Sequence, residues 1–287
     1  MSAGRAGVMN RIGETLGAEV SSRSLGLMRI FICIFVMYRF NGLWSPRHFT
    51  GEPLQILVAV VFLLANIFCL VGYQTKVAKL ALGICVVVGF LYLGQHLGVA
   101  RFKKPFHPFH MVLLLALTPC GRSCSVDRWL AVRRARREGG PPPPERVNWL
   151  LVELFVLQIC VMYVWAGYDK LDPGWLSGER LERTWMDAHF TSDALGAHPW
   201  LHPLAKVSSW GVTATELGLP LLLVVRRFRP WVMWWGVAFH LAIYFTLNAP
   251  DFTMMVLVSY ISCLSPRGVD RVMEDLFTPA AEARDVP

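Results

Sequence analysis

Residues 149–168 read WLLVELFVLQICVMYVWAGY, and the next two residues are Asp169 and Lys170. A helix needs about 20 mainly apolar residues to cross the hydrocarbon core of a bilayer, and this run has that length. It therefore predicts a membrane span that ends at a lysine. Such a lysine either extends its ammonium group to the lipid headgroups or has a role inside the protein, and both interpretations are open at this point.

The composition of the whole chain also indicates a membrane protein. Its 287 residues are 54% hydrophobic and only 17% charged, whereas soluble domains carry more charge and fewer apolar blocks. The apolar runs predict an all-α bundle of about eight membrane helices, two of them short, with no large extramembrane domain. These predicted spans are residues 25–44, 54–72, 77–97, 107–118, 149–168, 205–225, 231–248 and 252–264.

The basic residues predict how this bundle is oriented. Eight spans put both termini on one face, and most lysines and arginines outside the spans fall on that face, which the positive-inside rule makes cytoplasmic. We therefore predict a multi-pass protein of a bacterial inner (plasma) membrane, with Lys170 at the outer face. The net charge of +8 then reflects topology and contact with anionic membrane lipid, and it does not indicate nucleic-acid binding.

The chain divides into one membrane domain and three polar segments. Residues 1–24 have no continuous apolar core and predict a cytoplasmic segment rather than a signal peptide, residues 25–266 form the membrane domain, and residues 267–287 form a cytoplasmic tail. Within the domain, residues 120–148 hold an arginine cluster and four consecutive prolines, which predict a basic linker without regular structure. The seven cysteines are mostly scattered through the spans as apolar residues, and no metal site is predicted.

Charged residues inside predicted spans need a partner or access to water, except where, like Arg39 toward the outer end of the first span, they can extend to the headgroups. Arg29 lies early in the first span and Glu216 near the middle of the sixth. A charge inside the bilayer costs about 3 kcal/mol or more unless it is paired or hydrated. We therefore predict a structural ion pair between Arg29 and Glu216.

Other polar residues recur at helical spacing and predict the walls of a cavity. Residues three or four positions apart share one face of a helix. Gly167 is expected to leave open space beside Lys170. Two histidines one turn apart enter the short fourth span near the predicted outer face. The residues concerned are Tyr163, Gly167 and Lys170 in the fifth span, His240, Tyr244 and Asn248 in the seventh, and His107 and His110 in the fourth.

A lysine beside such a cavity has usable chemistry. Desolvation favours the neutral amine, which can act as a base. Asp169 and Asp172 would favour the ammonium form if they were ionised close to it. The sequence leaves the charge state of Lys170 open.

Residues 158–175, which read QICVMYVWAGYDKLDPGW, are similar to the corresponding segment of the vitamin K-dependent gamma-glutamyl carboxylases and of the wider horizontally transferred transmembrane (HTTM) domain family. Four further blocks resemble that family in the same order along the chain. Together they cover residues 25–266. These blocks are Leu25–Phe31, Leu117–Trp129, Glu216–Pro220 and Phe239–His240.

The resemblance implies a specific chemistry for the lysine. In the carboxylases the lysine at the position of Lys170 is the proposed base that deprotonates vitamin K hydroquinone, and oxygen and carbon dioxide are co-substrates in the carboxylation of a peptide glutamate. By this resemblance Lys170 is a catalytic base, and His107 or His110 assists at the carbanion and carbon dioxide stage. His240 corresponds to a histidine of the seventh span, for which we expect a cavity-lining role.

The chain also departs from the carboxylases. It has Asp169 where they have a first lysine, and we expect no counterpart of their large substrate-binding region after the last span. We therefore predict an enzyme that uses a quinol and acts on a peptide glutamate or a small molecule, with a secreted peptide or a separate substrate-binding protein as partner. The alternative is a non-enzymatic membrane scaffold or peptide-maturation partner. A transporter would call for inverted repeats and broken helices, for which the sequence offers only its short segments.

Overall fold

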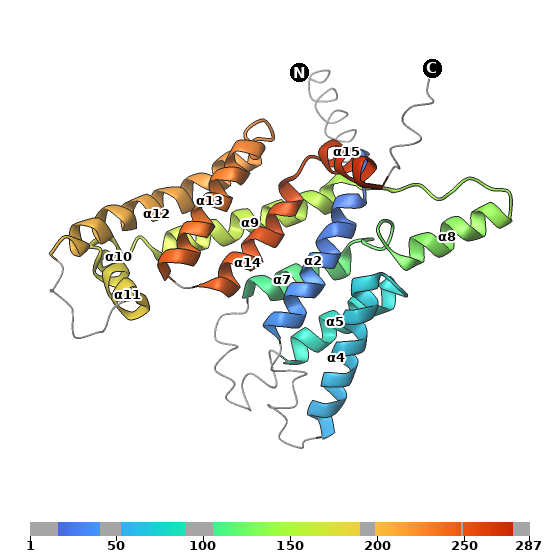
Figure 1. Cartoon of the computed structure of the whole chain (residues 1–287), viewed down its shortest axis with the longest axis horizontal. Coiled ribbons are helices and arrows are strands. Elements are labelled where there is room, and N and C mark those ends of the chain that lie inside the picture. Colours follow the sequence, from blue (N-terminus) through green and yellow to red (C-terminus); the bar gives the residue numbers. More distant parts are fainter. Residues whose placement is uncertain (1–16, 41–52, 90–105, 190–198, 248, 278–287) are drawn as a thin grey trace, which may run out of the picture. The chain divides into compact units, whose positions relative to one another are not determined.

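The computed structural model describes residues 17–40, 53–89, 106–189, 199–247 and 249–277 (Figure 1). The chain forms two compact units: unit 1 contains residues 1–155 and 264–287, and unit 2 contains residues 156–263. The helices within the described ranges are α2 (Arg23–Arg39), α4 (Pro53–Val71), α5 (Thr75–Val88), α7 (Phe106–Leu117), α8 (Val126–Arg137), α9 (Trp149–Asp169), α10 (Pro173–Leu176), α11 (Glu179–His189), α12 (Leu201–Val224), α13 (Arg229–Leu247), α14 (Pro250–Ser259), the 3-10 helix η5 (Tyr260–Cys263) and α15 (Pro266–Phe277).

The all-α prediction is confirmed, with one small addition, a two-stranded ladder of β1 (Glu19–Ser21) and β2 (Arg146–Asn148). In the described part of the chain four helices are long and apolar enough to cross a membrane, namely α4, α9, α12 and α13. A fifth is added if residues 252–263 and 266–275, which meet at 98°, form one broken span. The count of eight stays a prediction, since parts of the expected spans 25–44 and 77–97 lie outside the described residues.

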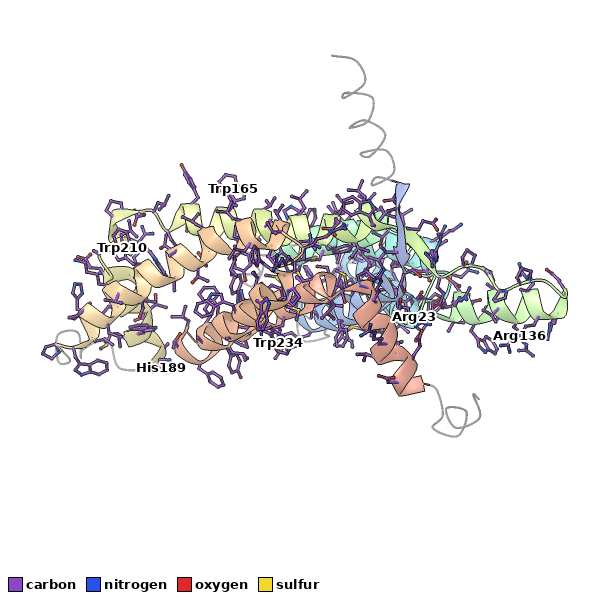
Figure 2. The ribbon with its side chains drawn as sticks, turned by 90° about the horizontal axis from the view of Figure 1, so that it is seen from above. Arg23, Arg136, Trp165, His189, Trp210 and Trp234 are labelled. Atoms are coloured by element: carbon purple, nitrogen blue, oxygen red, sulfur yellow. The ribbon has the colours of Figure 1, made fainter. Side chains whose placement is uncertain are left out.

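Large apolar side chains cover the outside of the long helices in unit 2. Trp165, Trp210 and Trp234 point away from the ribbon (Figure 2), and each side chain is more than half exposed. A soluble protein seldom exposes so many large apolar groups on adjoining helices. These faces suit contact with lipid.

Arg29 holds a loop inside unit 1. Its side chain is fully buried, and its guanidinium donates hydrogen bonds to the carbonyl oxygens of Cys120, at 3.1 Å, and Cys124. Backbone carbonyls therefore bind two nitrogens of this cation, whereas its buried Nε has no hydrogen-bond partner among the described residues. The partner that we predicted for Arg29 was Glu216, whereas the structure gives it the loop between α7 and α8.

The prediction that residues 120–148 lack regular structure is wrong. α8 begins after Ser125, whose Oγ accepts a hydrogen bond from the backbone N–H of Arg128 at 2.9 Å, as an N-cap residue does. β2 pairs antiparallel with β1, and Val20 lies opposite Val147. Composition alone suggested a linker, but the cap and the strand pairing give the backbone defined partners.

The tail predicted at residues 267–287 begins as a helix. α15 is tied to the start of α2, because Arg23 forms ion pairs with Glu145 at 3.0 Å, Glu274 at 3.2 Å and Asp270 at 3.5 Å. Partial burial lowers the pKa of Arg23, but the hydrogen bonds and charges of these carboxylates outweigh that effect and raise it. The cluster joins three segments that lie far apart in the sequence.

In unit 2 α12 extends well past the end of α9. α9 ends at Asp169, beside Glu216, whereas α12 begins at Leu201. At about 1.5 Å per residue, roughly 20 Å of α12 lies beyond that level. α10 and α11 pack against this part of α12 (Figure 1), and Trp175 in α10 donates its indole N–H to the Ser209 carbonyl at 3.3 Å. The α10–α11 segment therefore packs on the part of α12 that extends past α9, while Tyr168 and Leu171, at and just after the end of α9, stay exposed.

Candidate active site around Lys170

Lys170 forms a two-oxygen ion pair with Glu216. Its Nζ lies 2.7 Å from Oε2 and 2.9 Å from Oε1 of the carboxylate, and it also donates to the Ala166 carbonyl at 3.3 Å. The Lys170 side chain is 19% exposed and that of Glu216 only 3%. The prediction that Glu216 pairs with Arg29 is therefore corrected: its partner is the lysine that follows α9.

This pairing favours one of the two interpretations of the lysine. A snorkelling lysine extends along its helix toward the headgroups. Lys170 instead turns sideways onto α12, where its Nζ is bonded to both carboxylate oxygens of Glu216. Its ammonium group is bound inside unit 2.

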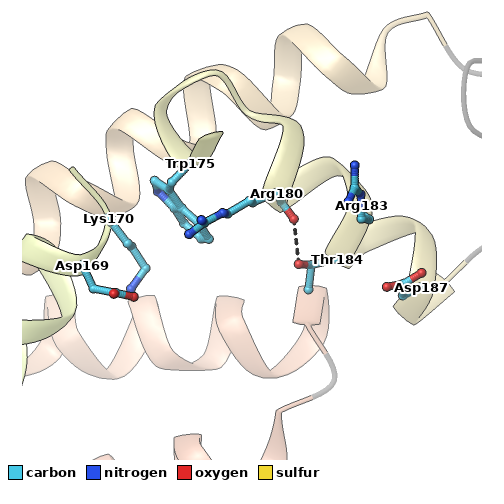
Figure 3. Close-up of a pocket in the computed structure, with 7 residues that line it drawn as sticks. All are labelled: Asp169, Lys170, Trp175, Arg180, Arg183, Thr184 and Asp187. Carbon is cyan, nitrogen blue, oxygen red and sulfur yellow. Dashed lines mark hydrogen bonds between the residues drawn. The ribbon is translucent and has the colours of Figure 1, made fainter. Parts of the chain in front are cut away.

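A pocket of about 410 Å³ opens beside Lys170, within the size range of small-molecule sites. The Lys170 ammonium lies 5.2 Å from the centre of the Trp175 ring, which permits a cation–π contact. Figure 3 shows Arg180 extending from α11 toward Trp175. The pocket is thus part aromatic and strongly charged, and its lining residues are Asp169, Lys170, Trp175, Arg180, Arg183, Thr184 and Asp187.

A hydrogen-bonded aromatic cluster lies deeper in unit 2. The Tyr163 hydroxyl is 2.7 Å from His240 Nε2 and is also hydrogen-bonded to the Tyr260 hydroxyl. All three side chains are buried, and His240 Nδ1 has no hydrogen-bond partner among the residues that the structure describes. Tyr163 and His240 were predicted to line a cavity with Lys170, but neither is among the residues that line this pocket.

Gly167 allows α9 to pack closely against α12, and it does not leave open space beside Lys170. A Cβ atom at this position would lie 2.7 Å from Leu217 Cδ2, so α12 fills the volume that we expected to be open. Tyr244 lies on α13 with 37% of its side chain exposed, and it contacts Phe245 edge-on. Asn248 lies outside the described residues.

The two histidines of the predicted fourth span belong to α7, in unit 1. His110 is exposed, with its ring 5.8 Å from that of Phe109. The side chain of His107 lies outside the described part of the chain. Their roles in catalysis stay a prediction.

Gly236 allows α13 to approach Tyr260 closely. A Cβ atom at this position would lie only 1.9 Å from the Tyr260 hydroxyl. Replacing Gly236 with alanine should therefore displace Tyr260, break its bond to Tyr163 and destabilise the protein by about 1–3 kcal/mol. The measurement is thermal unfolding in detergent.

Gly211 supplies the matched control for that substitution. It lies in α12, and a Cβ there would meet nothing within 4 Å. Gly211→Ala should leave the midpoint of thermal unfolding unchanged or raise it. Alanine is more favourable than glycine inside a helix by about 1 kcal/mol. Equal effects of the two substitutions would argue against a tight contact at Gly236.

The α11 face of the pocket was missed by the sequence analysis. Its residues follow the spacing i, i+3, i+4 and i+7, which places them on one side of a helix. The apolar Leu181 and Met186 are buried. This pattern was a usable signal, and the residues on the pocket side are Arg180, Arg183, Thr184 and Asp187.

A comparison with protein families identifies the chain's family. The HTTM domain matches residues 20–266, which is most of the chain. The chain therefore belongs to the HTTM domain family. With its four or five apolar helices, it is a multi-pass membrane protein. Searches among curated proteins and among solved structures found no match.

Proposed function

We propose that this HTTM protein is a carboxylase-like membrane enzyme that binds a reduced quinone beside Lys170 and uses the Lys170–Glu216 pair as its proton acceptor. The observation that carries the proposal is this ion pair, whose lysine lines a pocket together with residues of α10 and α11. An ion pair that only stabilises the contact between two helices needs no pocket beside it. Membership of the HTTM family supports the same assignment.

The residues of the pocket fit a quinol head group. Trp175 offers an aromatic ring against which a flat ring can stack, and Lys170 presents an amino group 5.2 Å from that ring's centre. Trp175 and Lys170 would hold the head group, and the apolar outer faces of the helices suit a lipid-soluble tail. When bound, the quinol would supply, with oxygen, the strong base that removes a glutamate gamma proton before carbon dioxide adds.

The protein's own contribution is to accept a proton at Lys170 Nζ. Transfer of one ammonium proton along the 2.7 Å hydrogen bond to Glu216 leaves a neutral amine. Burial penalises the separated charges, so it brings the neutral pair closer in energy to the ion pair. The Ala166 carbonyl keeps the nitrogen in place during this exchange. Lys170 and Glu216 then act as one base.

The α11 side of the pocket suits an acidic substrate, such as a peptide glutamate delivered by a secreted peptide or by a substrate-binding protein. Arg180 and Arg183 both line it, and Arg180 also lies 3.3 Å from Asp172. A guanidinium group binds carboxylates with charge-assisted hydrogen bonds. These arginines would orient the substrate, and Lys170 would act on the quinol.

Replacing Arg183 with glutamine should raise the KM for a glutamate peptide by roughly tenfold or more, because a hydrogen bond to a charged group is worth about 1.5–3 kcal/mol. Oxygen uptake driven by the quinol without peptide should stay unchanged. Lys206→Gln, on the exposed side of α12, is the control that removes one charge outside the pocket. An unchanged KM in the Arg183 variant would exclude this role.

The test of the function itself uses the full-length protein in lipid nanodiscs. Vitamin K hydroquinone, oxygen, labelled carbon dioxide and a short glutamate peptide are supplied, and oxygen uptake and label incorporation are measured. Uptake is expected with the hydroquinone and not with the oxidised quinone. A non-enzymatic scaffold would give no quinol-dependent uptake, with or without peptide.

A further inference from the structure

The basic helix α8 has an exposed face of unusual composition. Four of the helix's five arginines, Arg133, Arg134, Arg136 and Arg137, are exposed, and so are Trp129, at 57%, and Leu130, at 41%. The Arg133 guanidinium lies 5.2 Å from the centre of the Trp129 ring. A solvated charged face has no need of an exposed tryptophan and leucine, whereas an interfacial face combines the two kinds of residue.

The opposite face of α8 is occupied by the following segment. Arg128 forms an ion pair with Glu145 at 3.0 Å and donates to the Pro143 carbonyl. Gly140 donates its N–H to the Ala135 carbonyl at 2.9 Å. Only the arginine and tryptophan face is therefore free to contact another surface.

The start of α8 is fixed at the turn between α4 and α5. The two carboxylate oxygens of Asp127 accept hydrogen bonds from the backbone N–H groups of Gln74, at 2.9 Å, and Thr75, at 2.8 Å. The N–H of Asp127 donates to the Gly72 carbonyl at 2.9 Å. α4 is long and apolar enough to span the membrane, so this turn lies where the chain leaves the bilayer. Figure 1 shows α8 projecting from the α4–α5 hairpin at that end.

From this placement and charge we infer that the exposed face of α8 binds the anionic phospholipid headgroups of the bilayer in which the protein sits. Trp129 and Leu130 enter the interfacial layer, and the four arginines contact phosphate groups. Each basic residue close to an anionic membrane surface strengthens binding severalfold. This inference does not depend on the proposed enzymatic activity.

Hydrogen exchange of residues 126–138 in the full-length protein tests the inference. The protein is placed in nanodiscs of phosphatidylcholine alone or with phosphatidylglycerol, and each variant's exchange in neutral lipid is its own reference. Exchange in α8 should be about tenfold slower or more in the anionic discs, and 0.5 M salt should reverse much of that protection, since a salt solution screens these contacts.

The double variant Arg136→Gln with Arg137→Gln should lose most of the anionic-lipid effect. Arg226→Gln with Arg227→Gln removes the same charge from the exposed turn between α12 and α13, and it should leave exchange in α8 unchanged. Equal exchange of α8 in neutral and anionic discs for the unmodified protein would overturn the inference. So would an anionic-lipid effect that both double variants reduce equally.

Discussion

Replacing Glu216 with glutamine is expected to lower the quinol-dependent rate by about 100-fold or more, since proton transfer to a positioned group contributes about 10²–10⁴-fold. The amide can still accept a hydrogen bond from Lys170, but it cannot receive the proton. The same change leaves Lys170 without its counter-charge and should destabilise the protein by about 3 kcal/mol. Oxygen uptake and thermal unfolding in detergent measure the two effects.

Glu182 provides a matched control for this substitution. It lies in the same unit and shares a hydrogen bond of 2.6 Å with His202 Nδ1, but it does not line the pocket. Glu182→Gln should leave the quinol-dependent rate within about twofold of the unmodified protein, as expected for a partly exposed pair that contributes about 1 kcal/mol or less. A similar loss of rate in both variants would show that the Glu216 effect is not specific.

A double substitution separates a catalytic pair from a structural one. Replacing Lys170 with methionine and Glu216 with leucine removes both charges and puts apolar side chains of similar size in their place. Exchange of a buried ion pair for apolar residues of similar volume is often neutral or stabilising. The double variant should therefore regain the stability that Glu216→Gln loses, while its activity stays abolished.

The sequence predicted the helices well because apolar length and helix breaks are local properties. The expected spans 54–72, 149–168 and 231–248 agree with α4, α9 and α13 to within two residues at each described end. The segment around α8 was mispredicted for the opposite reason. Its structure depends on the contact of Asp127 with the α4–α5 turn and on the pairing of β1 with β2, and neither contact is visible in composition.

The partner of Glu216 shows why the site was only partly predictable. Arg29 and Glu216 were two opposite charges inside predicted spans, so pairing them was the simplest way to satisfy both. That choice assumed that Lys170 lay at the membrane surface because α9 ended there. α12 extends beyond α9 and brings Glu216 to the level of Lys170, and relative helix offsets of this kind have no signature in a single sequence.

Lys170→Ala is the second substitution with a large expected effect. It removes the proposed proton acceptor and the cation beside Trp175, so quinol-dependent turnover should fall by about 100-fold or more. It also leaves Glu216, only 3% exposed, without its cation, and that carboxyl group should become protonated. Protonation avoids a buried charge, so the protein should remain folded.

The most direct test compares oxygen uptake by the unmodified protein, Lys170→Ala and Lys206→Ala in nanodiscs supplied with vitamin K hydroquinone. Lys206 lies exposed on α12 and does not line the pocket. Its replacement with alanine therefore removes the same kind of side chain at a position outside the pocket. A folded Lys170→Ala protein without quinol-dependent uptake, beside a fully active Lys206→Ala protein, is the predicted result. Quinol-dependent uptake by Lys170→Ala at more than half the unmodified rate would contradict the assignment of Lys170 as the base.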